Sequence, residues 1–460
     1  MGPSPPGDAE MSTATLRLAE PASSGGDSWR INVLVAIRVV IALLVVANLG
    51  RVPLLSTGDR EAPILLNDLG MLFIVGIGAL SGIVSRSFRI DKLTMLALVF
   101  AGVGAYAALL AVPRYGLTPW QLVISLAYLA RWLAYFGLYV VIINVVRSDD
   151  VGVLWRTLES AIIAFAAFGL VQAIFIPHFA QVVYPDSRVV IDFDEQGHRL
   201  VSTVLEPNMA GAMIMLVLLV QLAQLAGGVR LSSWKPLLLF SALVATLSRS
   251  SMLGLMVGGA VILLARGVSK RLLRSFIVIG AIGLAAAPWL LRFAASYGKL
   301  GIDASALTRV ASWIRAIRIF SDHPLLGIGF NTYAFVQERY GYVRMGNGTY
   351  SVDGGLLFIA VMTGLVGVSL YLAMIVLVVR RCRSVWREPT ASAEHRALAT
   401  GIAAGTLALC VHSLFVNSLL TSFVMEPLFL LWSLSFLMAR QIVSRPAPPT
   451  HPFALAVASP

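Results

Sequence analysis

Long apolar runs recur along the whole chain and leave few fold classes open to it. Each run of about 17 to 25 residues is long enough to cross the hydrocarbon core of a bilayer as a helix. Hydrophobic residues make up 58% of the 460 residues and charged residues only 13%, which excludes a water-soluble domain of this size. We therefore predict an all-α polytopic membrane protein with about 12 transmembrane helices. The predicted spans begin near Ile31, Pro63, Leu93, Leu117, Val151, Ser202, Lys235, Ser250, Leu272, Gly354, Arg396 and Phe423.

The spans are predicted to form one transmembrane domain, residues 30–445. The first 29 residues are rich in Pro, Gly, Ser and Ala and contain no apolar run, which predicts a disordered cytoplasmic tail. Residues 446–460 are predicted to form a second cytoplasmic tail. The run from Lys235 to Ser248 is short for a full crossing and predicts a tilted or half-buried segment.

The charge distribution predicts the orientation of the spans. The net charge is +12, which in a soluble protein would raise the question of a nucleic-acid partner. Here arginine and lysine residues gather in every second loop, so the positive-inside rule explains them and no nucleic acid is expected. Those loops and both termini are predicted to be cytoplasmic. The loop cations are Arg86, Arg89, Lys92, Arg147, Arg156, Arg230, Lys235, Arg266, Lys270, Arg271, Arg274, Arg380, Arg381, Arg383 and Arg387.

Two long loops, about residues 177–201 and 292–353, are then predicted to face outward. The second loop contains an amphipathic helix, which we expect to lie at the membrane surface with Trp313 buried and the Arg309 guanidinium among headgroup phosphates. The same loop is rich in tyrosine, whose rings and polar tips suit sugars as well as interfaces. The apolar stripe of the helix comprises Val310, Trp313, Ile314, Ile317 and Phe320, and its opposite face carries Arg315, Arg318 and Asp322.

Three arginines are predicted at the outer membrane face: Arg199, Arg249 and Arg309. Guanidinium groups bind diphosphate oxygens in a bidentate way and do so without a metal. For Arg249, which lies between two apolar runs, a snorkelling side chain at a helix end is the alternative.

The triplet Glu206-Pro207-Asn208 places a carboxylate, a proline and an amide at the outer end of a span. Intramembrane carboxylates usually have a function. Alternatively, the proline occupies a first helical turn, which tolerates it, and Asn208 satisfies freed backbone groups. Both interpretations remain open. Structural roles are expected for Arg38, Arg131, His412 and Glu426, with Arg131 pairing with a carboxylate such as Glu159.

Three motifs lie in the second half of the chain. The most specific motif is Arg309, Trp313, His323-Pro324-Leu325 and Gly327-Ile328-Gly329; the others are Ser248-Arg249-Ser250 and Arg199 with Glu206-Pro207-Asn208. These motifs resemble those of a known family, the O-antigen ligase and polymerase superfamily of bacterial envelope glycosyltransferases, whereas the first half of the chain is similar only in being a run of apolar helices.

The resemblance implies roles for these residues. Arg249 and Arg309 would hold the diphosphate of an undecaprenyl-diphosphate-linked glycan donor and stabilise it as it leaves, with no metal or cofactor required. The substrate-binding residues implied are Arg199, Glu206, Asn208, Trp313 and His323. In ligases of this family a histidine precedes a Gly-x-x-Gly span and is thought to activate the acceptor hydroxyl. Counting back from Gly364 places Asp353 at that position. An aspartate can also accept this proton; its alternative role is a turn or helix N-cap residue.

The function implied is an inverting glycosyl transfer at the outer face of the bacterial inner membrane. The acceptor would be another lipid-linked repeat unit in a polymerase of surface polysaccharide or exopolysaccharide, which we favour, or a lipid A core in a ligase. A chain-length regulator is a possible further partner. A transporter or flippase of lipid-linked oligosaccharide is the competing class, but it would place its site near the bilayer midplane. A third alternative is that the protein is only a structural partner in an assembly, but the three arginines at the outer face would then have no role.

Overall fold

The computed structural model describes residues 24–46, 53–55, 64–85, 88–183, 199–266, 304–342 and 351–443. Helices dominate these residues, and one short antiparallel ladder joins β1 (Pro53–Leu55) to β2 (Ile64–Leu65). The helices before the middle of the chain are α1 (Ser24–Val46), α2 (Leu66–Ser85), α3 (Lys92–Tyr115), α4 (Pro119–Val145), α5 (Val151–Phe175) and α6 (Phe179–Val183). Those that follow are α8 (Pro207–Ala226), α9 (Trp234–Ala245), α10 (Arg249–Arg266), α12 (Ala304–Asp322), α13 (Tyr333–Val336), α14 (Gly355–Arg387), α15 (Ala393–His412) and α16 (Ser422–Val443).

The helices agree with the apolar runs of the sequence. Every predicted span within the described residues corresponds to a helix, whereas the span expected near Leu272 lies outside them. Seven helices of the described part are long and apolar enough to cross a membrane. The multi-pass class is therefore confirmed, and the number of about 12 spans stays a prediction. Helix α1 begins at Ser24, so the last residues of the predicted N-terminal tail are helical.

Helix α9 has the short length that the sequence predicts. Its 12 residues span about 18 Å, well below the roughly 30 Å of a bilayer core. The chain then reverses within three residues, Thr246 to Ser248, and Leu247 adopts a left-handed conformation with φ of 53°. This short turn joins α9 to α10 and carries the Ser-Arg-Ser motif at the start of α10.

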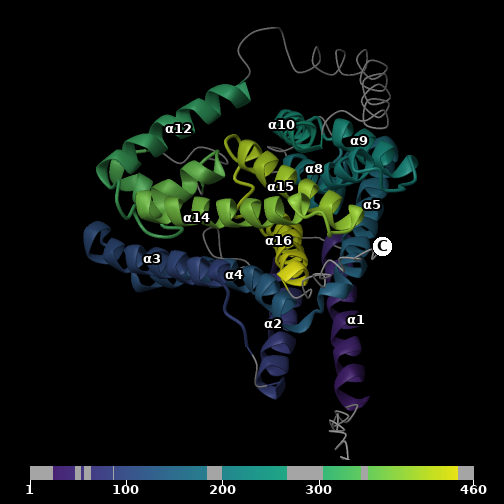
Figure 1. The fold of residues 1–460 in the computed structure, drawn as a ribbon. Helices are drawn as coiled ribbons and strands as arrows, with labels where there is room; N and C mark the ends of the chain where they lie inside the picture. The colour runs from purple at the N-terminus through teal and green to yellow at the C-terminus, as the bar shows by residue number, and fades with distance from the viewer. Residues whose placement is uncertain are drawn as a thin grey trace, which may run out of the picture.

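Helix α8 lies at the centre of the packed core, with nearly all of its side chains buried. Helix α15 packs against both α8 and α10, and α14 packs against α15 (Figure 1). Glycines permit these close approaches. A Cβ atom on Gly401 would lie 2.5 Å from the Val220 Cα, and one on Gly254 would lie 3.0 Å from the Ala408 carbonyl oxygen. Small residues at such contacts are typical of membrane helix packing.

Helix α14 is broken at Gly364, which has φ of 65° and ψ of −168°. A break leaves backbone groups without their helical partners, and inside a membrane bundle these groups must be satisfied by other protein groups. The loop after α12 supplies the partners. The four hydrogen bonds run from Ile328 N to Val361 O, Gly329 N to Met362 O, Leu365 N to Pro324 O and Val366 N to Leu325 O.

The glycines of the 327–329 motif and of the α14 break are required by this backbone exchange. A Cβ atom on Gly364 would lie 2.1 Å from the Leu325 carbonyl oxygen, and one on Gly327 would lie 2.4 Å from the Val361 carbonyl oxygen. Both glycines also have positive φ values. The Pro-Leu-Leu-Gly-Ile-Gly segment therefore joins α12 to α14 as a structural element.

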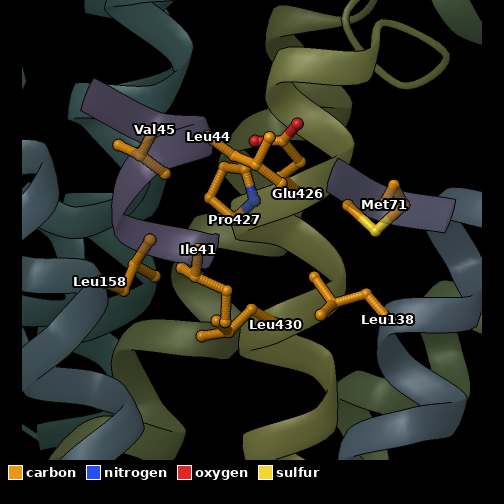
Figure 2. A pocket seen from close by; sticks show the side chains of 9 residues that line it. All are labelled: Ile41, Leu44, Val45, Met71, Leu138, Leu158, Glu426, Pro427 and Leu430. Atoms are coloured by element: carbon orange, nitrogen blue, oxygen red, sulfur yellow. The ribbon is translucent and has the colours of Figure 1, made fainter. Parts of the chain in front are cut away.

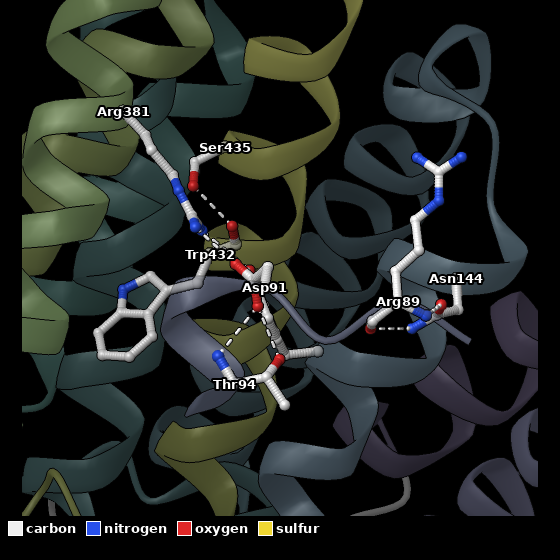
Figure 3. Close-up of polar contacts among 8 residues, drawn as sticks. Arg89, Asp91, Thr94, Asn144, Arg381, Trp432 and Ser435 are labelled. Atoms are coloured by element: carbon white, nitrogen blue, oxygen red, sulfur yellow. Dashed lines mark hydrogen bonds and ion pairs between the residues drawn. The ribbon is translucent and has the colours of Figure 1, made fainter. Parts of the chain in front are cut away.

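An ion pair and a hydrogen bond connect the C-terminal ends of α14 and α16 to neighbouring segments. Arg381, near the end of α14, binds Asp91 at 2.5 Å, and Asp91 caps α3 by accepting from the Thr94 backbone N–H at 2.9 Å (Figure 3). Arg440, near the end of α16, donates to the carbonyl of Val146 at 3.2 Å. Arg381 is one of the loop cations to which the sequence analysis applied the positive-inside rule.

The expected pairing of Arg131 with Glu159 is wrong. Arg131 on α4 binds Asp68 on the neighbouring α2 at 2.8 Å. Glu159 on α5 faces α8 and α9 instead, where it binds Lys235 at 2.9 Å and accepts from Gln221 at 2.9 Å. Each charge thus has a partner on an adjacent helix, and removal of one partner would leave the other charge buried and uncompensated.

Candidate active site

Five helices bring their ends or faces together at one end of the bundle. The N-termini of α8, α10 and α14, the C-terminus of α15 and one face of α12 meet there. Ser248 at the start of α10 donates to the Asn208 side-chain oxygen on α8 at 3.0 Å. The Gly355 N–H at the start of α14 donates to the Ser413 carbonyl after α15 at 2.6 Å. The candidate site residues of α8, α10, α12 and the 353–355 segment therefore surround one region, opposite the Arg381–Asp91 end.

Asp353 is held in place by α12. Its backbone N–H donates to the Ser312 hydroxyl at 3.1 Å, and its carbonyl accepts from the Trp313 indole N–H. Gly354 follows with φ of 131°, and a Cβ atom there would lie 3.0 Å from the Leu414 carbonyl oxygen. The carboxyl is thus fixed in a tight turn between α12 and the end of α15.

The electrostatics of Asp353 suit a proton acceptor. Burial raises the pKa of its carboxyl, although the Arg309 charge, the Ser312 hydroxyl and the Arg315 charge act in the opposite direction. A raised pKa makes a carboxylate a stronger base. The alternative role of Asp353 as a helix N-cap is wrong, because Gly354 occupies the cap position of α14 and no side chain caps it.

Arg309 lies half-buried on α12, close enough for its charge to act on Asp353. Among the described residues, Arg309 makes no hydrogen bond and no ion pair to another side chain. Its five N–H donors therefore remain available for an anionic ligand.

The predicted amphipathic helix is confirmed as α12, which begins at Ala304, before the first residue of the predicted stripe, and lies beside α14 at the edge of the bundle (Figure 1). The structure changes the expected environment of the face that carries Trp313. Trp313 is half-buried against the protein, with its ring 6.1 Å from that of Phe415, rather than inserted among lipids. The outward apolar surface consists of Val310, Ile314 and Ile317, which are 44%, 63% and 52% exposed. The face packed on the protein comprises Ser312, Ala316 and Ile319.

Arg249 is the first residue of α10, and its side chain is exposed. The serines on both sides of it are buried in a hydroxyl network, with Ser248 lying 3.2 Å from Ser250. The network reaches α8, because Asn208 accepts from Ser248 and donates to Glu206 at 3.2 Å. Buried hydroxyls therefore fix the turn on which Arg249 projects.

Arg199 is held on the same turn. Its guanidinium donates to the Thr246 carbonyl at 2.9 Å, and the following residue, Leu200, donates its N–H to the Ala245 carbonyl at 2.9 Å. The structure thus places Arg199 and Arg249 on either side of the α9–α10 reversal. Pro207 occupies the first turn of α8, as the structural interpretation of the Glu-Pro-Asn triplet expects, while the Glu206 side chain is only 2% exposed.

His323 is not brought together with Arg309. It follows α12, about 20 Å along the helix from Arg309. There its Nδ1 lies 3.5 Å from the Arg114 guanidinium, and its ring packs edge-on against Tyr115. Burial and the Arg114 charge lower the pKa of His323. This histidine lies at the junction of α12, α3 and the loop that joins α14.

His412, for which the sequence analysis expected a structural role, lies directly before the residues that contact the 353–355 segment. It ends α15 with no exposed surface, and the Arg309 charge and the Asn208 backbone both act on its ring. No motif marks it, because its neighbours in the site come from α8 and α12. In the sequence, only its position at the end of an apolar run distinguished His412.

Two other features lie apart from this region. A small pocket is lined by apolar residues of α1, α2, α4, α5 and α16, and Glu426 is the acidic residue among its lining side chains (Figure 2). Glu426 accepts a hydrogen bond from Asn67 at 2.7 Å. Within the described ranges, no group of three or more His, Cys, Asp or Glu residues is arranged to hold a metal ion.

Comparison with known proteins identifies one family. Residues 237–372 match the family model described as O-antigen ligase. The match runs from within α9 into α14 and includes Arg249, Arg309, Trp313, His323 and Asp353, whereas Arg199, Glu206, Asn208 and His412 lie outside it. No curated protein matches the chain significantly.

Proposed function

Since the chain belongs to the O-antigen ligase and polymerase superfamily through residues 237–372, we propose that it is an inverting glycosyltransferase of lipid-linked glycans. The donor is a glycan on undecaprenyl diphosphate, and the acceptor is a sugar hydroxyl of another lipid-linked repeat unit. The enzyme is thus a polymerase of a surface or secreted polysaccharide in the bacterial inner membrane, and the site faces outward. Transfer to a lipid A core is the ligase alternative.

The reaction uses the groups that converge beside α12. The acceptor hydroxyl attacks the anomeric carbon of the donor, and its proton passes to the Asp353 carboxylate. The bond between the anomeric carbon and the diphosphate oxygen breaks, and undecaprenyl diphosphate leaves with the bonding electrons. Arg309 and Arg249 stabilise the negative charge that develops on it, and Arg199 contributes a third cation. A metal or cofactor takes no part in this proposal.

One observation carries the proposal: Asp353, a carboxyl whose pKa is raised by burial, lies within the field of Arg309. A base for the acceptor and a cation for the leaving group are both required for displacement at a diphosphate-linked sugar. The Asp353 backbone donates to the Ser312 hydroxyl and accepts from the Trp313 indole, and these two hydrogen bonds fix residue 353 relative to the helix that carries the cation. Such preorganisation is a principal source of rate in enzymes.

A transfer assay tests the proposal. The full chain in lipid nanodiscs is given an undecaprenyl-diphosphate-linked repeat unit, and both the released undecaprenyl diphosphate and the new linkage are measured. We expect release to accompany each new glycosidic bond, with inverted anomeric configuration. Release without bond formation, or retention of configuration, contradicts the proposed chemistry.

A deletion strain distinguishes polymerase from ligase. Single repeat units on their lipid carrier are expected to accumulate when a polymerase is removed. Long unattached chains would accumulate when a ligase is removed, and that result would replace the polymerase assignment while keeping the same leaving group.

The transporter class is tested in proteoliposomes. Buried charges inside the bundle, such as Asp68 and Arg131, are common in carriers, but these two are paired with each other. We expect no translocation of a labelled lipid-linked oligosaccharide between leaflets by this chain alone. Translocation without any transfer would favour the carrier.

A further inference from the structure

Two arginines meet at the end of the bundle opposite the candidate active site. Arg266 is the last residue of α10, and Arg396 is the fourth residue of α15. The Arg266 Nε donates to the Thr400 hydroxyl at 3.0 Å, and that hydroxyl donates to the Arg396 carbonyl at 2.8 Å. Because Arg396 and Thr400 are about one helical turn apart, the Arg266 guanidinium lies on the face of α15 that carries Arg396.

Neither guanidinium has an anionic partner in the described part of the chain. Arg266 Nη2 and Arg396 Nε are buried and make no hydrogen bond there. No carboxylate of the described residues forms an ion pair with either side chain. The acid closest in sequence to Arg396 is Glu394, which is two positions away and therefore points to a different side of α15. A buried donor without an acceptor destabilises a fold, most of all when it belongs to a charged group.

The charges around the two side chains add to this cost. The Arg396 charge acts on Arg266, and like charges repel each other. Arg396 also lies in the first turn of α15, where the helix dipole disfavours a cation. Arg266 lies at the C-terminus of α10, where the dipole favours a cation, so the dipole explains only one of the two arginines. An anion bound between them would satisfy the buried donors and offset the repulsion.

Phosphate is the anion that this pair suits best. A guanidinium group presents a planar fork of N–H donors that matches the oxygens of a phosphate, and two such groups can bind one phosphate from two sides. Both side chains are only partly buried, so a ligand can reach them from the surface of the bundle.

The position of the pair favours a lipid headgroup over a free phosphate ion. Helix α10 has 18 residues and spans about 27 Å, close to the thickness of a bilayer core, so its two ends lie near opposite headgroup layers. Its surface is apolar close to Arg266, where Leu264 is 89% exposed. An acyl chain can lie along this surface while the phosphate binds at its end. Basic pockets between membrane helices are typical sites for anionic lipid headgroups.

We propose that Arg266 and Arg396 form a binding site for the phosphate headgroup of an anionic phospholipid, in the leaflet opposite the candidate active site. The phosphate lies between the two guanidinium groups and accepts from Arg266 Nη2 and Arg396 Nε. The site is separate from the proposed donor site, because Arg249 and Arg266 are at opposite ends of α10. The inference therefore does not depend on the proposed glycosyl transfer.

A lipid titration tests the site. The full chain is delipidated in a neutral detergent, and phosphatidylglycerol is added. Native mass spectrometry measures lipid binding, and thermal unfolding gives the Tm. We expect Arg266→Gln and Arg396→Gln each to bind the lipid about tenfold or more weakly than the wild type and to lose most of the increase in Tm that the lipid gives. Arg383→Gln, which removes an exposed arginine of α14, is the matched control and should behave as the wild type.

Without lipid, the expected effect on stability has the opposite sign. Arg396→Gln removes a charge that repels Arg266, so its Tm in lipid-free detergent should equal or exceed that of the wild type. A purely structural role for Arg396 would instead lower the Tm equally with and without lipid, and that result contradicts the proposal.

The remaining outcomes are also decisive. Wild-type lipid binding by both site variants overturns the site, and so does an equal loss in Arg383→Gln, which would indicate non-specific attraction. Inorganic phosphate is the second probe. If it raises the wild-type Tm as much as phosphatidylglycerol does, the ligand is a free phosphate and the lipid assignment is wrong. If Arg396→Gln does not fold, lipid binding by Arg266→Gln decides by the same criterion.

Discussion

The indole N–H of Trp313 donates to the backbone carbonyl of Asp353, so the helix that carries Arg309 also holds the residue at the position of the family's histidine. Trp313 was expected to bind substrate or lipid. Its contact with Asp353 indicates a positioning role as well, since the ring packs between the 353–354 turn and Phe415, and its substrate-binding role stays a prediction. Arg309 and Trp313 are four residues apart, about one helical turn, so both lie on the same side of α12 as Asp353.

Trp313→Phe tests this contact. The change keeps an aromatic ring against Phe415 but removes the donor to Asp353, whose turn then loses one of its anchors. We expect kcat for glycan transfer to fall about tenfold with a smaller change in KM for the donor, because one hydrogen bond is worth about 1 kcal/mol. Trp120→Phe, at an exposed position on α4, is the matched control and should keep the wild-type rate. Wild-type kcat in Trp313→Phe would show that the contact does not position the base.

The pH dependence of transfer should follow Asp353. The carboxylate must be ionised to accept a proton, so the rate rises as pH increases through its pKa, which burial raises above the usual aspartate value. The Arg309 charge lowers that pKa. Removing it in Arg309→Ala should therefore move the acidic limb of kcat to higher pH, in addition to slowing the reaction. An acidic limb that does not move, or moves to lower pH, would contradict the assignment of this limb to Asp353.

Replacing Asp353 by the family's histidine is a second test of the base. Asp353→His supplies a base with a pKa near 6.5 and should retain measurable transfer with its acidic limb near that pH. Asp353→Asn keeps the size of the side chain but cannot accept the proton, so its rate should fall at least about a hundredfold. Equal activity of the Asn and His variants would indicate that residue 353 does not handle the proton.

Gly364→Ala should destabilise the fold without touching the site chemistry directly. The added methyl group would collide with the Leu325 carbonyl at a residue of positive φ, which costs about 2 kcal/mol or more. Gly102→Ala on α3 is the control, because nothing lies within 4 Å of its added Cβ. Thermal unfolding in detergent should show a lower Tm for Gly364→Ala and an unchanged or higher Tm for Gly102→Ala. Equal Tm values would argue against the backbone exchange between α14 and the loop after α12.

Apolar periodicity was sufficient to predict most of the helices, because bilayer thickness and backbone hydrogen bonding leave a membrane chain few choices. The break at Gly364 could not be predicted from apolar periodicity. Its hydrogen bonds go to residues 324–329, some 40 positions earlier, and local patterns contain no information about such an exchange. The wrong ion-pair partner was expected for Arg131 for the same reason. Which carboxylate Arg131 binds depends on which helices are adjacent, and local sequence patterns do not show this.

The candidate site was predicted in part. Residues within one motif, such as Arg309 and Trp313, could be associated from spacing alone, and their family resemblance assigned Asp353 to the same region. The hydroxyl network between Ser248 and Asn208 joins two helices whose proximity only the fold shows. His323 illustrates the opposite case, because a motif residue proved to lie near Arg114, away from Arg309. Residues 184–198, 292–303 and 343–350 of the two predicted outer loops lie outside the described residues, and the outward orientation of both loops stays a prediction.

Chelation provides a test of the proposed electrostatics. Guanidinium groups are expected to stabilise the departing diphosphate, so excess EDTA should leave the transfer rate unchanged. The measurement compares initial rates with and without chelator after dialysis against metal-free buffer. Loss of activity that a divalent cation restores would assign the leaving-group charge to a metal instead of the arginines.

The most direct test of the account compares transfer rates of Arg309→Ala and Arg318→Ala in nanodiscs with an undecaprenyl-diphosphate-linked donor. Both arginines lie on α12, but Arg309 acts on Asp353 whereas Arg318 is exposed on the same helix. The account predicts a loss of about a hundredfold or more for Arg309→Ala, with Arg318→Ala near the wild-type rate. A wild-type rate in Arg309→Ala, or equal losses in the two variants, would contradict it.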